Sequence, residues 1–222
     1  VWIMSVAAGP NIVEDGLVLA LDAGNIRSYP GSGSSWIDIS SNNRNFTLSG
    51  GPSFTTLNGI SCADKTGNGK VSNTSMPNLG NNYTLMSWAY SLTDAQTSDW
   101  RTLFRTDTNE HPILIQNTTN LIGMWDESFR SYGITADNYE GKWTCYTAVG
   151  IGGSSQTLYL NDGSVNASVN YNSTGEALDY IGGSINGDQN FGYVATAFFY
   201  DKSLSQSEVS QNYNALKSRF GL

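Results

Sequence analysis

The sequence lacks basic clusters and long apolar runs. Only 11 of its 222 residues are Lys or Arg, against 19 Asp or Glu, and the formal net charge is −8. Nucleic acids and anionic membranes are held by basic patches, and no cluster of Lys and Arg occurs. No run reaches the roughly 18 apolar residues that a membrane-spanning helix needs. We therefore expect no nucleic-acid partner and no membrane insertion.

Cysteine and histidine are also scarce. Cys62 and Cys145 stand far apart and fit no zinc spacing. They form either a disulfide between strands distant in the sequence or two buried free thiols, since free cysteine packs as a small hydrophobe. His111 is the single histidine, and Pro112 follows it without a neighbouring Ser or Cys motif. We interpret His111 as a turn residue rather than a triad member or a zinc ligand.

Paired carboxylates are missing as well. Glycosidases hold two carboxyl groups roughly 5–10 Å apart across a cleft, and on one strand these would alternate as E-x-D-x-E. The nearest candidate is Asp126-Glu127, whose adjacent side chains would point to opposite faces of a strand. The glycine-rich "IGGSINGDQNFG" has no Lys-Ser/Thr after it and indicates turns rather than a phosphate loop. The sequence therefore predicts a protein that is not an enzyme.

What the sequence does contain is a series of short apolar and alternating segments separated by polar turns. Residues 17–21 predict a first buried strand, 24–35 a loop, and "WIDIS" an alternating segment. The clearest strand is 81–92, where one face would carry Thr84, Met86, Trp88, Tyr90 and Leu92. This face has the larger apolar side chains, so we expect it to face the core. Short strands at this spacing predict an all-β sandwich or barrel.

Two local signals are stronger. Asn161-Asp162-Gly163 lies between alternating runs and predicts a hairpin. Near the C-terminus, Ser205 followed by Glu208 forms a capping box, and four apolar residues then recur at helical spacing: Val209, Tyr213, Leu216 and Phe220. We expect one short helix that docks on the sandwich and ends at Gly221. Residues 1–15 predict an extended N-terminal arm, and 16–222 a single domain.

Three stretches together resemble a known pattern: "DGLVLALDAGNIRSYPGSGSSWIDIS", "NYTLMSWAYSL", and "TLYLNDGSV" with the later "IGG" and C-terminal helix. The chain resembles laminin-G-like, concanavalin A-like jelly rolls, and more narrowly those of bacteriophage structural proteins and bacterial surface proteins. The resemblance covers about residues 10–222 and is loose in the middle, where "KWTCYTAV" replaces a Trp-His-His strand that is common in the family. It implies two antiparallel sheets in a recognition or assembly module, which often binds carbohydrate and sometimes calcium.

Candidate binding residues follow from these expectations. Glycan sites need an exposed aromatic face beside polar groups, and three aromatic residues lie in or next to polar segments: Trp100, Trp125 and Tyr132. Calcium takes six to eight oxygen ligands, and Asp22, Asp162 and Asp188 stand at predicted turns. Aspartate is also a common turn former, so a purely structural role is the alternative. We expect no required cofactor, with calcium as an optional ion.

The predicted function is that of a non-enzymatic structural protein on the surface of a phage virion, as a capsid decoration or a tail or fibre component. Its expected partners are other virion proteins, with host surface glycans and a second copy of the chain as further candidates. The alternative is a bacterial lectin domain, secreted or on the cell surface. Val1 with Met4 just behind it fits a GTG start codon in a bacterial or phage gene, and proteolytic trimming is the other explanation.

Overall fold

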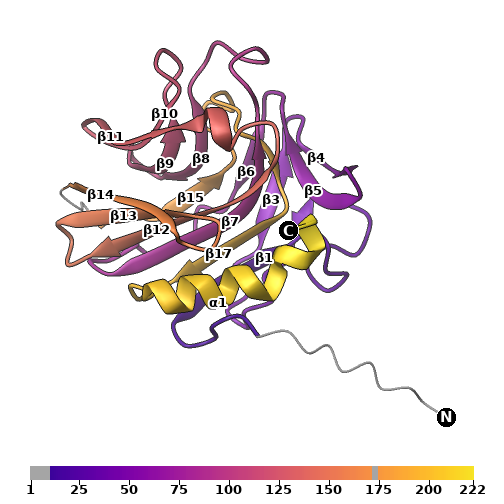
Figure 1. Ribbon diagram of the computed structural model, residues 1–222. Helices are drawn as coiled ribbons and strands as arrows, with labels where there is room; N and C mark the ends of the chain where they lie inside the picture. The colour runs from indigo at the N-terminus through magenta and orange to yellow at the C-terminus, as the bar shows by residue number, and fades with distance from the viewer. Residues whose placement is uncertain (1–10, 172–174) are drawn as a thin grey trace.

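A computed structural model describes residues 11–171 and 175–222. The described residues form two antiparallel sheets of nine and eight strands that pack face to face, and one short helix (Figure 1). The predicted all-β, two-sheet jelly-roll sandwich with a C-terminal helix is therefore confirmed.

The nine-stranded sheet follows the order β14-β13-β12-β7-β16-β5-β4, and β17 also pairs with β7 and carries β1 beyond it. Its strands are β1 (Leu17–Asp22), β4 (Ser53–Leu57), β5 (Ile60–Lys65), β7 (Tyr83–Ser91), β12 (Trp143–Ile151), β13 (Ser155–Leu160), β14 (Val165–Asn170), β16 (Gly192–Val194) and β17 (Thr196–Tyr200). The predicted hairpin joins β13 to β14 and is confirmed.

The eight-stranded sheet follows the order β11-β10-β9-β8-β15-β6-β3-β2. Its strands are β2 (Ser35–Trp36), β3 (Phe46–Ser49), β6 (Lys70–Ser72), β8 (Arg101–Thr106), β9 (His111–Ile115), β10 (Leu121–Asp126), β11 (Ser128–Thr135) and β15 (Leu178–Ile181). Only the first residue of "WIDIS" lies in a strand, because Asp38 and its neighbours leave the sheet to cover an edge. A 3-10 turn, η1 (Ala136–Asn138), follows β11.

Strand β7 corrects one prediction. Leu85 and Ala89 lie in the core between the two sheets, whereas Met86 and Trp88 belong to a second cluster on the outer face of the nine-stranded sheet. The face with the larger side chains was predicted to point into the sandwich, and this is wrong. Both faces of β7 are buried, since the helix covers the outer one, so the size of the side chains does not identify the inner face.

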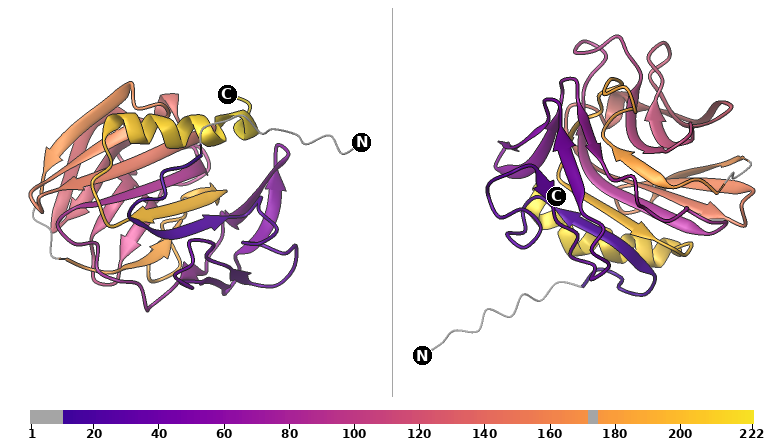
Figure 2. Two further views of the ribbon diagram at one scale, coloured as in Figure 1. Left: turned by 90° about the horizontal axis from the view of Figure 1, so that it is seen from below. Right: turned by 180° about the vertical axis from the view of Figure 1, so that it is seen from behind.

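Helix α1 (Gln206–Leu216) and the 3-10 turn η2 (Lys217–Phe220) cover that outer face (Figures 1 and 2). The predicted capping box is present: Ser205 Oγ accepts from Glu208 N at 3.3 Å, and Ser205 N donates to Glu208 Oε2 at 2.8 Å. The Phe220 ring stacks on Trp88 at 4.1 Å between centroids, and Gly221 ends the segment at φ 76°. The helix is thus tied to β7 by aromatic stacking.

Strand β1 is covered along the edge that faces away from β17. Asp38 Oδ1 accepts from Ala20 N at 2.9 Å, and Ile39 N donates to the Ala20 carbonyl at 2.9 Å. The Val18 carbonyl accepts from Arg44 Nη1 at 2.9 Å and from Asn42 Nδ2 at 3.1 Å. The segment that follows the loop of residues 24–35 therefore returns to β1 and supplies hydrogen-bond partners, mostly side chains, for the main-chain groups of that strand.

Part of the predicted N-terminal arm falls outside the described residues, namely 1–10. Residues 11–15 contain no strand or helix, but they pack on the domain. Val13 is buried and its N–H donates to Asn212 Oδ1 at 2.7 Å, while Asp15 pairs with Lys202 at 2.7 Å. This part of the arm is therefore anchored to the helix and to the turn before it.

Both cysteines are buried free thiols, which decides between the two alternatives that the sequence left open. Burial raises the pKa of Cys62 and of Cys145 to about 12. Both side chains pack in the cluster under α1, where they act as small hydrophobic groups. Within the described residues, no helix combines the length and the apolar character that crossing a membrane requires.

Candidate functional site

Two of the three predicted aromatic residues meet on the outer face of the eight-stranded sheet. Ile122 and Met124 of β10 point into the core, so Trp125 points outward. Its ring meets that of Trp100, from the loop before β8, at 5.8 Å between centroids and an interplanar angle of 90°. Together they line a pocket of about 190 Å³. The other lining residues are Asn109, His111, Leu114 and Gln189.

A glycine makes room for the aromatic wall of this pocket. Phe129 of β11 pairs across the strands with Trp125, and its ring meets Trp100 edge-on at 5.3 Å. A Cβ atom on Gly123 would lie 2.3 Å from the Phe129 ring. The absent side chain at Gly123 therefore leaves room for the Phe129 ring, which supports Trp100. Both indoles are half-buried, so each keeps a solvent-accessible part.

The polar side of the pocket is a hydrogen-bonded row. Thr102 Oγ1 donates to Gln189 Oε1 at 2.9 Å and lies 2.9 Å from His111 Nδ1. The main chain strengthens the same contact, since Thr102 N donates to the Gln189 carbonyl at 2.9 Å. His111 begins β9 and is buried, so its interpretation as a turn residue is wrong. Gln189 and Thr102 are distant in the sequence, and only the fold brings them together.

A buried lysine fixes the loop that carries Gln189. Lys65 is almost fully buried, and its ammonium donates to the carbonyls of Gly67 and Gly187 at 3.1 Å each, and to Asn190 Oδ1. Burial lowers the pKa of Lys65 to about 8, against the opposing pull of Asp188. The loop 182–191 is built of turns, as predicted, and Lys65 holds it from beneath.

A buried arginine fixes the opposite wall. Arg101 follows Trp100 and is fully buried, with ion pairs of 2.7 Å to Asp94 and 2.7 Å to Glu140. It also donates to Asn120 Oδ1 and to the Leu92 carbonyl. One guanidinium thus joins the loop before β8, the turn before β10 and the residues after η1. The network therefore anchors the chain at the residue that directly follows Trp100.

His111 gives the site a measurable acid response. Burial, and secondarily the positive charge of Arg105, lower the pKa of His111 to about 3. The unfolded chain therefore binds one more proton than the folded protein between pH 6.5 and 3, and stability falls as pH falls through this window. We expect protonation of this group in the unfolded chain to lower the free energy of unfolding by about 2 kcal/mol between pH 6.5 and 4.5. Urea unfolding of the wild type and of His111→Gln at both pH values measures it: parallel losses in the two proteins would contradict the prediction.

Tyr132 does not join the two tryptophans. Its side chain is only 6% exposed and belongs to the core between the sheets. Gln156 Nε2 donates to its hydroxyl, and burial raises its pKa well above the usual range of tyrosine. Tyr132 thus lacks the exposed ring for which it was selected, because it stands three residues after the outward-facing Phe129 and alternation along β11 turns it to the inner face.

The three candidate calcium ligands lie apart. Asp22 pairs with Arg219 at 2.6 Å, Asp162 accepts from Ser164 N at 3.0 Å in the hairpin turn, and Asp188 accepts from the Ser184 hydroxyl. Within residues 11–171 and 175–222, no three or more His, Cys, Asp or Glu side chains are grouped as metal ligands would be. Each of the three therefore has a local structural role, and calcium binding stays a prediction.

The only carboxylate pair that the sequence offered for hydrolysis is split. Asp126 is buried at the end of β10 and pairs with Arg130 at 3.1 Å. Glu127 is exposed in the turn to β11, with φ at 53°. The two side chains are therefore held in different environments, as expected for adjacent residues of a hairpin.

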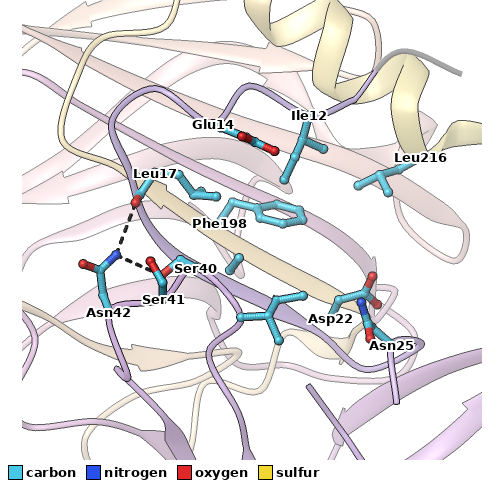
Figure 3. A pocket seen from close by; sticks show the side chains of 12 residues that line it. Ile12, Glu14, Leu17, Asp22, Asn25, Ser40, Ser41, Asn42, Phe198 and Leu216 are labelled. Carbon is cyan, nitrogen blue, oxygen red and sulfur yellow. Dashed lines mark hydrogen bonds between the residues drawn. The ribbon is translucent and has the colours of Figure 1, made fainter. Parts of the chain in front are cut away.

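A larger hollow of about 640 Å³ lies between the N-terminal segment, β1 and the end of α1 (Figure 3). Phe198, Leu17 and Ile12 supply its apolar surface. Two of its polar residues serve the fold: Asn42 bonds the carbonyls of β1, as the dashed line to Leu17 shows, and Asp22 holds Arg219. The smaller pocket places two partly exposed indole rings beside two side-chain amides, so we regard it as the candidate site.

Comparison with known proteins supports the fold and leaves the family open. No protein-family model matches the sequence, and no curated protein matches it in a sequence search. Among solved structures, the receptor-binding domain of botulinum neurotoxin C/D mosaic serotype is similar, with a TM-score of 0.65 and 15% identity over 90% of this chain. The ligand-binding domain of serotype D in complex with N-acetylneuraminic acid gives 0.64, with 15% identity over 90% of this chain.

Trypanosoma rangeli sialidase in complex with the inhibitor DANA gives a TM-score of 0.62 and 13% identity over 94% of this chain. The present chain spans 51% of each toxin domain and 35% of the sialidase chain. At such identities the likeness shows a shared fold. It also leaves about half or more of each similar protein without a counterpart here.

Proposed function

We propose that this domain binds carbohydrate, with the pocket between Trp100 and Trp125 as the contact site. The observation that carries the proposal is the convergence of two half-buried indoles, one from a loop and one from a strand, with two side-chain amides in one small hollow. Pockets of this composition, apolar and aromatic with a few placed polar groups, are typical small-molecule sites.

The chemistry of a sugar ring fits these walls. One face of a pyranose carries C–H groups, which pack on the electron-rich face of an indole, while its hydroxyls need donors and acceptors. Trp100 and Trp125 supply the rings at right angles. Asn109 and Gln189 supply amides at the rim, and Leu114 supplies apolar floor. The domain would therefore hold a sugar by stacking and orient it by hydrogen bonds.

The similar proteins support the class of ligand. One is a toxin domain in complex with N-acetylneuraminic acid, and another is a sialidase. Since this chain spans about half of the toxin domain, the likeness does not assign that ligand to the shared part. The similar proteins therefore show only that this fold occurs in glycan-recognising proteins. The assignment of a binding site in this chain rests on the composition of the pocket.

Trp125→Ala and Trp100→Ala are expected to weaken glycan binding at least about tenfold each, because each removes a stacking surface worth more than about 1.4 kcal/mol. Tyr193→Ala is the matched control, since it removes a half-buried aromatic ring from the other sheet. A glycan array followed by titration calorimetry on the strongest ligand measures the effect. Equal binding by all four proteins would overturn the proposed site.

We propose binding without turnover. The carboxylates of Asp126 and Glu127 are held apart, one paired with Arg130 and the other in an exposed turn. The likeness to a sialidase covers about a third of that chain, so it carries no active site over to this one. Incubation of the bound glycan with the domain should leave it chemically unchanged in mass spectrometry.

The location on a phage virion stays a prediction from the sequence, because none of the similar proteins named above supports it. A sugar-binding domain fits that role and the alternative role in a bacterial lectin equally well. Quantitative mass spectrometry of purified particles separates the two: a constant copy number per capsid protein after high-salt washing would support the virion role.

A further inference from the structure

We propose that the pocket between Trp100 and Trp125 selects an uncharged sugar residue and rejects sialic acid. This inference rests on the proposed function, since it names the ligand class of the same site. The proposed ligand differs from the N-acetylneuraminic acid that a similar toxin domain binds. The inference is based on the charges and hydrogen-bonding groups of the pocket itself.

The pocket lining carries no formal charge. Its six residues are two tryptophans, a leucine, two amides and one histidine. The histidine is His111, which is 4% exposed and is kept neutral by its burial. A carboxylate in such a pocket would lose hydration without gaining a cationic partner, which is costly in a partly desolvated site. A neutral sugar avoids that cost.

The hydrogen-bonding groups point to hydroxyl or amide ligands. Thr102 Oγ1 donates to Gln189 Oε1, so in this arrangement His111 Nδ1–H donates to Thr102 and His111 Nε2 remains an acceptor. The amide nitrogen of Gln189 remains a donor. A sugar hydroxyl both donates and accepts and can use both groups. A carboxylate only accepts, and it would place its oxygens beside the lone pair of His111.

The two arginines near the pocket already have hydrogen-bond or ion-pair partners, and acidic side chains stand beside them. Arg105 is 8% exposed and lies beside the pocket, where it donates to the Thr108 carbonyl at 3.1 Å and to Asn109 Oδ1 at 3.4 Å. Arg130 pairs with Asp126. Next to lining residues in the sequence stand three acids: Glu110, Asp126 and Asp188. The local balance is therefore not cationic, and the chain as a whole has a net charge of −8.

The size of the pocket fits one ring. Its volume of about 190 Å³ is below the ~300–1,000 Å³ of pockets that take drug-sized ligands. A single sugar at the end of a chain, or a branch that projects from it, would enter, and further residues would lie outside. The terminal residue should then decide affinity, so removing a terminal sialic acid should expose the preferred ligand.

The test uses pairs of oligosaccharides that differ only in a terminal sialic acid, printed on an array and then titrated in solution. The proteins are the wild type, Trp125→Ala and Asn109→Arg, the last of which adds a cation at an exposed rim position. We expect the wild type to prefer the desialylated member of a pair at least about tenfold, which corresponds to about 1.4 kcal/mol. Trp125→Ala should lose this binding, and Asn109→Arg should narrow the preference.

Other outcomes separate this inference from the proposed function. Preference for the sialylated member, lost in Trp125→Ala, would overturn the uncharged-sugar inference and leave carbohydrate binding in place. Equal binding of both members would also overturn it. Binding of no glycan, or glycan binding that Trp125→Ala leaves unchanged, would overturn the proposed site and with it the inference. Circular dichroism and unfolding curves of the variants establish that each is folded.

Discussion

Arg101→Met is expected to lower the free energy of unfolding by about 3 kcal/mol. Removing the cation of a buried ion pair leaves the carboxylates and carbonyls that it bonded without a hydrogen-bond donor. Arg101 is fully buried and carries two ion pairs, to Asp94 and Glu140. Asp94 is half exposed and can regain water, whereas Glu140 and the carbonyl of Leu92 cannot do so without opening the loop. Most of the loss therefore comes from the buried acceptors.

Lys202→Met is the matched control. Lys202 also makes two ion pairs, at 2.7 Å to Asp15 and 2.9 Å to Glu208, but its side chain is 31% exposed. Ion pairs in water contribute little, and we expect a loss below about 1 kcal/mol. Urea unfolding of the three proteins gives both values. Similar losses in the two variants would show that burial of Arg101 adds nothing.

The Arg101→Met variant also tests how the site is built. Arg101 fixes the loop that presents Trp100, so loosening this network should weaken glycan binding although the substituted side chain would touch no ligand. The expected sign is a higher dissociation constant at a temperature where the variant is still folded. Unchanged affinity would mean that Phe129 alone holds the Trp100 ring in place.

Trp88→Ala is expected to cost about 4 kcal/mol, within the range for truncating a fully buried aromatic residue. Trp88 lies under the helix, stacked on Phe220 with an interplanar angle of 3° and on Tyr213 with centroids 5.3 Å apart. The loss should therefore be coupled to the helix. In a double-mutant cycle with Phe220→Ala, we expect a coupling energy of about 0.5–1.5 kcal/mol.

Two measurements decide this prediction. Amide exchange in 206–216 should become faster in Trp88→Ala, because the helix loses its stacking surface. Trp125→Ala is the control, since a half-buried indole on the other sheet should leave that exchange unchanged. Additive losses in the cycle, with a helix that stays protected, would place the stabilising role of Trp88 elsewhere than at the α1 interface.

The class of fold and most local elements were predictable, because they depend on residues close in the sequence. The hairpin at Asn161-Asp162-Gly163 and the capping box at Ser205 are local signals of this kind. The orientation of β7 was not predictable. Its two faces are both apolar, and only the helix at the far end of the chain determines that Trp88 lies outside the sandwich.

The candidate site shows the same division. Trp100 and Trp125 could be selected because each stands in a polar segment of the sequence. Gln189 and His111 could not, since the first is brought to Thr102 by a loop distant in the chain and the second is hidden at a strand start. Tyr132 was selected by the same rule as the tryptophans, and it failed because local polarity does not show which face of the strand a residue occupies.

The covered edge of β1 has a consequence for assembly. An open edge strand invites another chain to add a strand by main-chain pairing, both in specific complexes and in aggregation. Beside β1 the groups needed for such pairing are already bonded to Asp38, Asn42 and Arg44. Asp38 thereby acts as a gatekeeper against strand addition, and a second copy of the chain could not lengthen the nine-stranded sheet there without first displacing these side chains.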